Sequence, residues 1–567
     1  MKNKTVVAIT GTIGSGKSTL CNILEKLQCK VISTDKIGHQ ILPRVKQKLV
    51  KTFGESILLP VGKKINRKKL ASLVFSSHKY LEELNKITHP KILEKLEKLV
   101  LKSKKNLVFV EIPPVFSVDI SQCFDLIVQI ETCPDLLKNR LITKDKSYLE
   151  RVKSQLGNKL LKKSNYNIKN DGTVENLRND AKYLLDYCQK IRPTFKKPFS
   201  FAYLPKVCVC VTEAKLEVCK EKINYILKHQ HLAEFRLDFL PELPSDLKNW
   251  KKKGIIATLR TKNQGGHSEL SGEKYAEALY KIDNLGFEFI DIAFENAEEL
   301  DFTKFKSKII LSYHNFKNTP QDLEKIAVKM AKQNPYCIKI ATMMQDINDN
   351  FTIFRLLQKF PNLIAFGMGE KGELSRILCL KYGSPFTYTY LPEKSAVAPG
   401  QIDLDSLSNL YHFQTINSQT AVFGLIGENI AKSFSRAYHN KHFSSRKIDA
   451  CFVNFPIDCQ AELTTFLKNF LLFEWEGAAI TMPYKQKILS LVESVDKTAS
   501  KIGAINTLSN DNGNLKAYNT DWIGAIEPLL RKSSLLNKKV LLLGNGGAAK
   551  DLIRTSPRKS ASYRLCS

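Results

Sequence analysis

The chain has 567 residues, of which 43% are hydrophobic and 25% charged, and this length predicts two to four domains rather than a single core. Its formal net charge is +31, from 87 Lys and Arg against 56 Asp and Glu, but no zinc-finger, RNP-type or recognition-helix pattern accompanies the excess. We therefore expect a solvated, lysine-rich surface and small anionic substrates, with nucleic-acid binding as the less favoured alternative.

The thirteen cysteines and the first residues of the sequence bear on the compartment. No cysteine falls in a CxxC pair or a zinc-binding spacing, and Cys208 and Cys210 are interpreted as core filler on one face of a strand. MKNKTVVAITG contains no signal-peptide segment, and no apolar run approaches the roughly 20 residues of a membrane span. We expect a cytoplasmic protein with no tightly bound metal and no membrane partner; a homo-oligomer is left open.

The first motif is a phosphate-binding loop. VVAITGTIGSGKSTL predicts a strand, a glycine-rich turn and a helix, and residues 11–18 fit G-x-x-x-x-G-K-[ST]. Backbone N–H groups of such a loop hold phosphates, Lys17 reaches the β- and γ-phosphates, and Ser18 is a ligand for the Mg²⁺ of MgATP. The residues expected to bind ATP are Gly11, Thr12, Ile13, Gly14, Ser15, Gly16, Lys17, Ser18 and Thr19.

Acidic and basic residues follow this loop at separate points of the chain. Asp35 ends a second strand in CKVISTD, and Glu111 lies in the apolar strand NLVFVE. A basic helical stretch offers Arg140, Lys144 and Arg151 as a lid over a polyphosphate. The alternative for each lid residue is a solvated helix face.

With INRKKLASLVF and NKITHPKI, these motifs resemble dephospho-CoA kinase over about residues 4–192. The resemblance implies a P-loop kinase fold whose substrates are ATP and dephospho-CoA. It also implies that Asp35 takes the proton of the acceptor 3′-hydroxyl and that Arg140 and Lys17 balance charge on the transferred phosphoryl group. His89 is carried over only as a structural or acceptor-site residue. Ser33 departs from the family, which often has an acidic residue there. We expect a kinase domain over 1–192 and a linker over 193–205.

Eight strand-like runs then follow, separated mostly by helical patterns such as PQDLEKIAVKMAKQ. Eight alternations of strand and helix over residues 206–415 predict a (β/α)₈ barrel, whose catalytic residues lie at the carboxyl ends of the strands. The runs are KVCVCVT, HLAEFRLDF, GIIATLR, FEFIDIAF, KIILSYHN, YCIKIAT, NLIAFGMG and PFTYTYL. Their ends supply Glu234, Arg236, Asp238, Arg260, His314 and Lys339.

Lys339 lies in an apolar strand, where a charged amine is costly to bury. Burial and neighbouring cations favour a neutral nucleophile that attacks a carbonyl carbon, and His314 is placed to move the proton next to the resulting Schiff base. Taken singly, the alternatives are a lysine that reaches solvent and a histidine packed in the core.

With SYHNFKNTP, GELSR and APGQ, the stretch resembles type I 3-dehydroquinate dehydratase over about residues 204–415. The resemblance implies that Lys339 forms an imine with 3-dehydroquinate, that His314 is the general acid–base, and that Arg376 holds the carboxylate. The residues implied to bind hydroxyls or order the site are Glu234, Arg236, Arg260 and Gln401. Gln264 replaces the family's usual carboxylate, and Val397 a small hydroxyl residue; both changes are expected to weaken substrate placement.

The remaining segment begins after the polar connector HFQTINSQT. Ser433 and Ser435 are spaced to donate to a carboxylate, Lys485 follows a strand end, and KKVLLLGNGGAAKDLI begins like a dinucleotide-binding unit. From about residue 421 the order of these motifs resembles shikimate dehydrogenase. The resemblance implies the catalytic pair Lys485 and Asp521; substrate contacts from Ser433, Ser435, Thr481, Asn506 and Thr507; and NADP contacts from Gly544, Gly546 and Gly547. A proline of the family is Arg436 here.

Together these patterns predict an α/β multidomain protein. We expect a P-loop kinase, a (β/α)₈ barrel, and a shikimate dehydrogenase substrate domain with the start of a Rossmann unit over 416–553. Residues 554–567 are expected to form an irregular tail, and dehydrogenase activity to be lost through truncation, with NADP bound only if the domain is completed. Two alternatives stay open: an active kinase followed by a degenerate relic, and a basic, non-enzymatic nucleic-acid-binding protein.

Overall fold

The computed structural model describes residues 4–566 with gaps at 76, 114–118, 143–160, 162, 195, 245–246, 248–249, 251, 299, 395, 533–537 and 544–560. The chain divides into two compact units. Unit 1 comprises Met1–Leu204 with Phe360–Asn362, and unit 2 comprises Pro205–Lys359 with Leu363–Ser567.

Unit 1 is built on a five-stranded parallel sheet in the order β2-β3-β1-β4-β5. The central strand, β1, is buried on both faces because its residues alternate between two cores: Val6 and Ala8 belong to one, Val7 and Ile9 to the other. The strands are β1 (Thr5–Thr10), β2 (Lys30–Ser33), β3 (Leu107–Glu111), β4 (Leu126–Glu131) and β5 (Tyr166–Lys169).

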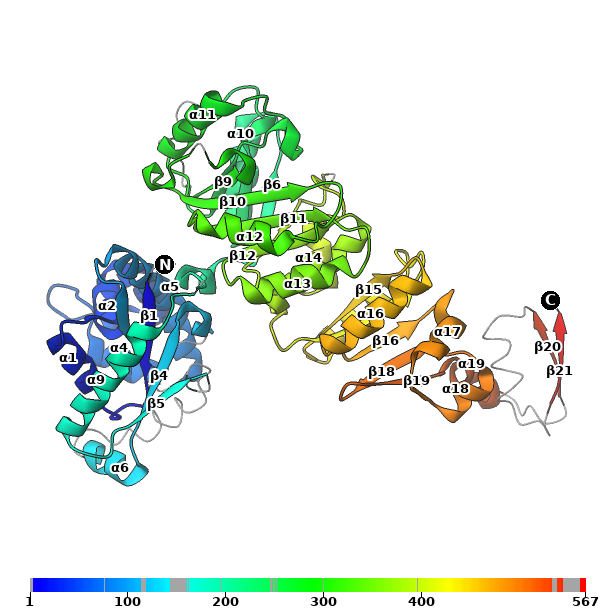
Figure 1. Ribbon diagram of the computed structural model, residues 1–567, viewed down its shortest axis with the longest axis horizontal. Helices are drawn as coiled ribbons and strands as arrows, with labels where there is room; N and C mark the ends of the chain where they lie inside the picture. The colour runs from blue at the N-terminus through cyan, green and yellow to red at the C-terminus, as the bar shows by residue number, and fades with distance from the viewer. Residues whose placement is uncertain are drawn as a thin grey trace. The chain divides into compact units, whose positions relative to one another are not determined.

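Helices cover both faces of this sheet (Figure 1). One core packs against α1 (Lys17–Lys26) and α9 (Val174–Lys190). The opposite core packs against α2 (Thr34–Ile41), α3 (Lys46–Phe53), α4 (Arg67–Phe75) and α5 (His78–Lys102). A shorter helix, α6 (Pro134–Ile142), follows β4. The phosphate loop lies between the end of β1, the central strand, and the start of α1. It is therefore at the carboxyl end of that strand.

The first part of unit 2 contains the eight expected strands, all paired in parallel in the order β12-β11-β10-β9-β8-β7-β6-β13. Phe366 of β12 and Tyr388 of β13 lie 5.8 Å apart between ring centroids, which brings the two ends of this order together. The strands are β6 (Val207–Val211), β7 (Leu232–Arg236), β8 (Ile255–Thr258), β9 (Phe289–Ala293), β10 (Lys308–Asn315), β11 (Cys337–Met343), β12 (Leu363–Met368) and β13 (Thr387–Thr389).

Amphipathic helices lie around these strands (Figure 1). They are α10 (Leu216–Lys228), α11 (Gly272–Asn284), α12 (Leu323–Lys332), α13 (Asp349–Lys359) and α14 (Glu373–Tyr382). The predicted barrel class is confirmed, and each predicted run overlaps one strand.

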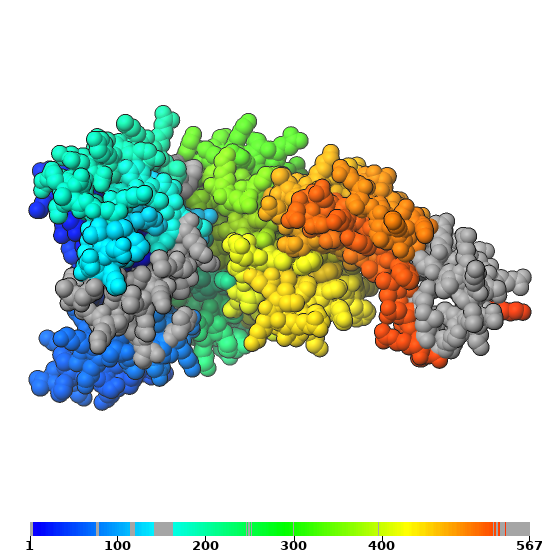
Figure 2. Space-filling model, turned by 90° about the horizontal axis from the view of Figure 1, so that it is seen from below, coloured from blue at the N-terminus to red at the C-terminus, as the bar shows by residue number. Residues whose placement is uncertain are grey.

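The second part of unit 2 is a six-stranded sheet in the order β15-β14-β16-β18-β19-β17. Strand β14 runs parallel to β15 and β16, whereas β18 runs antiparallel to β16 and β19. The strands are β14 (Ala421–Gly427), β15 (Ala450–Pro456), β16 (Gly477–Ile480), β17 (Ser494–Val495), β18 (Thr507–Asp511) and β19 (Asn514–Tyr518). The helices are α15 (Ser435–Ser445), α16 (Gln460–Leu472), α17 (Tyr484–Lys487), α18 (Lys497–Ile502) and α19 (Asp521–Lys532). In the space-filling view, the yellow and orange residues of this domain form one continuous body (Figure 2).

The end of the sequence differs from the expected irregular tail. Strand β21 (Ala561–Cys566) pairs in parallel with β20 (Lys538–Leu543). Lys538 pairs with Ala561 at one end of this two-stranded ladder, and Leu543 pairs with Cys566 at the other.

Within the described residues, none of the helices combines the length and apolar character required to cross a membrane.

Candidate active sites

The phosphate loop of unit 1 ends at Gly16, which adopts φ 101° directly before helix α1. A Cβ at Gly16 would lie 2.1 Å from Nδ2 of Asn170, so both the backbone angle and the available space require glycine. The Lys17 Nζ donates to the carbonyls of Gly11 and Thr12, each at 2.8 Å. Burial lowers the pKa of Lys17, and the carboxylates of Glu111 and Asp35 oppose that shift.

Ser18, Glu111 and Asp35 interact with one another or with Lys17 of this loop. Ser18 Oγ donates to Glu111 Oε1 at 2.6 Å, so the hydroxyl expected to bind Mg²⁺ has a carboxylate beside it. Burial, together with the charge of Glu111, raises the pKa of Asp35 above its ordinary value. A raised pKa suits a carboxylate that accepts a proton during the reaction.

Arg140 contacts the loop through two residues that the sequence did not single out. Its guanidinium donates to Thr132 Oγ1 at 3.2 Å and to the carbonyl of Asn170 at 3.1 Å. Asn170 Nδ2 in turn donates to the carbonyl of Ser15 at 2.8 Å. Lys144 and Arg151, the other expected lid residues, lie outside the described residues. His89 is buried in α5, where burial lowers its pKa to about 4.

In unit 2, one cavity at the barrel mouth gathers the expected dehydratase residues. It is lined by residues from six of the eight strands and from the segments that follow the strands. The expected members are Glu234, Arg236, Arg260, His314, Lys339, Arg376 and Gln401, and Gln264 and Val397 also line it. Asp238 lies just beyond and accepts two hydrogen bonds from Arg236, at 2.8 and 2.7 Å.

The neighbours of Lys339 differ from the expectation. Its Nζ lies 3.1 Å from Asp291 Oδ2, 3.6 Å from Glu234 Oε1 and 4.0 Å from the ring centroid of Tyr388. The sequence predicted cations next to this amine. The structure instead places two carboxylates and an aromatic ring against it. The charge balance inside a barrel depends on which strands face each other, which a linear sequence does not give.

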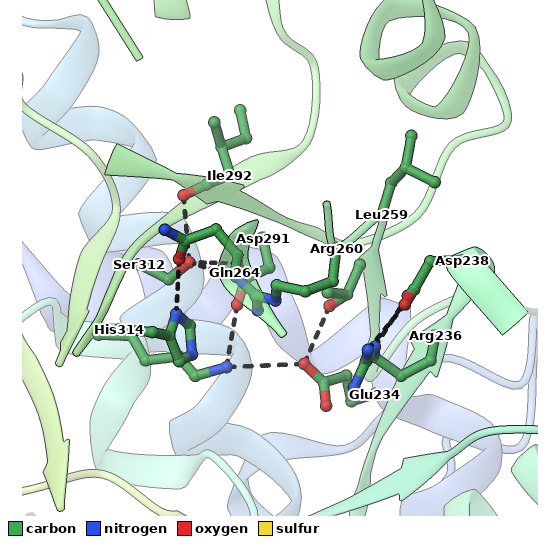
Figure 3. A network of polar contacts seen from close by, with 12 residues as sticks. Glu234, Arg236, Asp238, Leu259, Arg260, Gln264, Asp291, Ile292, Ser312 and His314 are labelled. Atoms are coloured by element: carbon green, nitrogen blue, oxygen red, sulfur yellow. Dashed lines mark hydrogen bonds and ion pairs between the residues drawn. The ribbon is translucent and has the colours of Figure 1, made fainter. Parts of the chain in front are cut away.

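Asp291 of β9 is the central residue that sequence analysis missed. Figure 3 shows it between Arg260 and Ser312. It lies 3.0 Å from Arg260 Nη2 and accepts a hydrogen bond from Ser312 Oγ at 2.6 Å. Burial alone would raise the pKa of Asp291, but the charges of Arg260 and Lys339 hold that pKa below its ordinary range. The signal available in the sequence was a single acid within the apolar strand FEFIDIAF.

His314 is held by Gln264. The Nδ1 of His314 lies 3.3 Å from Gln264 Oε1, which places a side-chain amide where it fixes the imidazole (Figure 3). Burial, reinforced by Arg260 and Lys339, lowers the pKa of His314 well below its ordinary value. The histidine is therefore neutral at neutral pH, as a general base requires. The structure places Gln264 against the histidine, whereas the sequence interpretation assigned it to substrate placement.

Arg376 and Cys210 complete the cavity. Among the described residues, none forms a hydrogen bond with Arg376 Nε, although the side chain is 2% exposed and its charge lies 4.4 Å from the ring centroid of Phe366. Burial lowers the pKa of Arg376 to about 10. Cys210, interpreted from sequence as core filler, lines the cavity and donates to Glu234 Oε2 at 3.0 Å.

The last domain holds two groups of expected residues. Lys485 forms an ion pair with Asp521, whose other carboxylate oxygen accepts from Asn506 Nδ2 at 2.7 Å. Ser433 and Ser435 share a second cavity with Thr481, and their hydroxyls lie 3.1 Å apart. Thr507 donates to Asn506 Oδ1 at 2.8 Å. The expected NADP contacts Gly544, Gly546 and Gly547 lie outside the described residues.

Family models match three consecutive regions of the chain. The model described as dephospho-CoA kinase matches residues 5–176, type I 3-dehydroquinase matches 207–418, and the shikimate dehydrogenase substrate binding domain matches 425–508.

Within the described residues, no group of three or more His, Cys, Asp or Glu side chains is arranged to hold a metal ion.

Similar proteins carry the same combination in part. The chain is 34% identical to the chloroplastic bifunctional 3-dehydroquinate dehydratase/shikimate dehydrogenase of Arabidopsis thaliana, over 58% of this chain and 59% of that protein's length. It is 32% identical to the 3-dehydroquinate dehydratase of Methanocaldococcus jannaschii, over 37% of this chain and 99% of that protein. A crystal structure of type I 3-dehydroquinate dehydratase from Clostridium difficile shares 24% identity, covers 36% of this chain and 89% of that one, and has a TM-score of 0.31.

The barrel relatives are thus matched over nearly their whole length. The chain belongs to the type I 3-dehydroquinate dehydratase family through residues 207–418, with a dephospho-CoA kinase domain before that region and a shikimate dehydrogenase substrate-binding domain after it.

Proposed function

We propose that the barrel dehydrates 3-dehydroquinate to 3-dehydroshikimate through an imine on Lys339. The observation that carries the proposal is that an amine, a neutral imidazole and a buried guanidinium line one cavity. Arg376 offers its free donor to the substrate carboxylate, which orients the ketone toward Lys339 Nζ. The other residues proposed to bind hydroxyls or order the site are Glu234, Arg236, Arg260 and Gln401.

The proposed chemistry uses each of these groups in turn. The Lys339 nitrogen adds to the ketone carbon, and loss of that oxygen as water leaves an iminium ion. His314 removes a proton from the adjacent carbon, and the electron pair is held as an enamine. The β-hydroxyl then leaves, taking a proton from His314, and water releases the product and restores the amine.

Variants of the two central residues test this proposal. Lys339→Met should abolish formation of the conjugated product, followed by its ultraviolet absorbance, because no nucleophile remains. His314→Ala should keep substrate binding and lose about 10²–10⁴-fold in kcat. Normal turnover by Lys339→Met would exclude imine chemistry on that residue.

We further propose that the kinase domain transfers the γ-phosphoryl group of MgATP to the 3′-hydroxyl of dephospho-CoA. The backbone of residues 11–19 fits the phosphates, Ser18 and Glu111 fit the Mg²⁺, and Asp35 is the proposed proton acceptor. Magnesium supplies charge neutralisation on the phosphates, while Lys17 and Arg140 stabilise the charge that develops during transfer.

The kinase proposal is tested with Lys17→Ala. Loss of a charge that clamps the transferred group should reduce coenzyme A formation by about 10²-fold or more. Lys30→Ala, an exposed lysine of the same sheet, is the control and should leave the rate unchanged. An equal rate in Lys17→Ala would remove this residue from the mechanism.

For the last domain, we propose binding of shikimate or 3-dehydroshikimate. Ser433, Ser435 and Thr481 would contact the ligand, with Lys485 and Asp521 as the pair that exchanges a proton with it. The domain type implies NADP as the redox partner.

A further inference from the structure

Arg436 directly follows the serine pair of the last domain and joins it to the barrel part of the same unit. Its Nη2 donates to the carbonyl of Ala431 at 2.6 Å, at the start of the turn that carries the serines. Its Nη1 donates to Tyr411 OH at 3.0 Å and to Glu373 Oε1 at 3.2 Å. One side chain thus connects the serine turn with residues that belong to the barrel.

The serine turn has few apolar contacts of its own. Ala431 and Lys432 are exposed, and Phe434, between the serines, is 88% exposed. Ser433 and Ser435 bond mainly to each other: Ser435 N donates to Ser433 Oγ at 3.2 Å. A turn without buried side chains needs polar anchors to keep its hydroxyls in one arrangement.

The barrel side of the contact is well fixed. Glu373 is the first residue of α14, and Arg376, one turn later, lines the dehydratase cavity. At the other end of this helix, Tyr382 OH accepts a hydrogen bond from Trp475 Nε1 at 2.7 Å, and Trp475 is fully buried. Helix α14 is therefore held by the last domain at both ends.

The Arg436–Glu373 pair is partly shielded from water. The two side chains are 18% and 29% exposed, and Tyr411 OH also lies 3.4 Å from Glu373 Oε1. Three hydrogen-bond partners already restrict the conformation of this guanidinium. Its further loss of conformational entropy when a ligand binds beside it is therefore small.

We propose that Arg436 is a positioning residue for the carboxylate site of the last domain. It holds the Ser433–Ser435 turn against Glu373 of α14, so that carboxylate binding there depends on a residue of the barrel. The inference rests on the proposed binding of shikimate by this domain.

Calorimetry with shikimate and the full chain tests the proposal. Arg436→Ala and Glu373→Gln should each weaken binding by about tenfold, because the turn loses its charged anchor. The double variant should be no weaker than either single variant, since both remove the same interaction. Arg436→Lys should recover part of the affinity, and Arg446→Ala, an exposed arginine just beyond the end of α15, should bind as the wild type does.

The outcomes separate the two proposals. If the wild-type chain does not bind shikimate, the proposed function of the domain is wrong. If the wild-type chain binds shikimate and both Arg436→Ala and Glu373→Gln bind it with the same affinity, the positioning role is wrong. It is also wrong if the losses of binding free energy in the two single variants add in the double variant. A thermal unfolding transition of Glu373→Gln that matches that of the wild type shows that this variant is folded, so the test does not depend on Arg436→Ala alone.

Discussion

At the scale of single residues, the barrel cavity is defined by how its buried charges are matched. Arg260 and Lys339 share Asp291, and Arg236 is held by Asp238. Arg376 differs, because its Nε has no hydrogen-bond partner among the described residues. A buried donor without a partner is costly, and this free donor supports the proposal that Arg376 binds an anionic group of the substrate.

Replacing this guanidinium tests its role. Arg376→Gln should raise the KM for 3-dehydroquinate by about 10–100-fold, because a charge-assisted contact with the carboxylate is lost. Steady-state kinetics measures the change, and borohydride labelling at saturating substrate should persist because the nucleophile is intact. A KM equal to that of the wild type would contradict the assignment.

The contact between Gln264 and His314 predicts a pH effect. The lowered pKa of His314 means that kcat/KM falls on the acid side only as the pH drops well below 6.5. Gln264→Glu places an anion beside Nδ1, which stabilises the imidazolium and should move this acid limb upward by about one pH unit or more. The pH dependence of kcat/KM in the two proteins gives the answer; coincident acid limbs would show that residue 264 does not set the state of His314.

At the scale of elements, the phosphate loop depends on the contact between Gly16 and Asn170. In Gly16→Ala the new Cβ would displace the amide that binds the carbonyl of Ser15, and φ 101° would be strained. We expect at least about a tenfold rise in the KM for ATP. Gly62→Ala, with φ 74° and open space around the Cβ, is the matched control and should show backbone strain of about 1 kcal/mol without loss of ATP binding.

The elements themselves were largely predictable from sequence, because their patterns are local. The run YCIKIAT indicates a buried strand with Lys339 inside it, and β11 has this form. Asp291 was not singled out, because its role depends on the register that places Ile310 opposite it and Ser312 two residues further on. Gln264 was interpreted only as a replacement for a family carboxylate that helps to place the substrate. The contact between its side-chain amide and His314 becomes visible only in the folded chain.

At the scale of the whole molecule, the two units carry separate chemistry. Lys17 and Lys339 belong to different units. Lys17→Ala should therefore leave the dehydratase kcat/KM within about twofold of wild type, and Lys339→Met should leave kinase turnover equally unchanged, because residues that share no contact partner usually act additively. Assays of both reactions on both variants measure this; a large cross-effect in either direction would show coupling between the units.

Contacts between distant segments were beyond the reach of sequence analysis. The hydrogen bond of Trp475 to Tyr382 joins residues 93 positions apart, and the pairing of β21 with β20 follows no local pattern. Arg436 shows the same limit: it was recognised as a departure from the family, but its partner Glu373 is visible only in the folded chain.

The most direct test of the central claim is covalent trapping at the barrel lysine. When borohydride is added with 3-dehydroquinate, mass spectrometry of the digested protein should find the reduced adduct on the peptide containing Lys339. The adduct should be absent from Lys339→Met, because reduction captures only the imine on that nitrogen. A label on another lysine, or no label under conditions of active turnover, would contradict imine catalysis by Lys339.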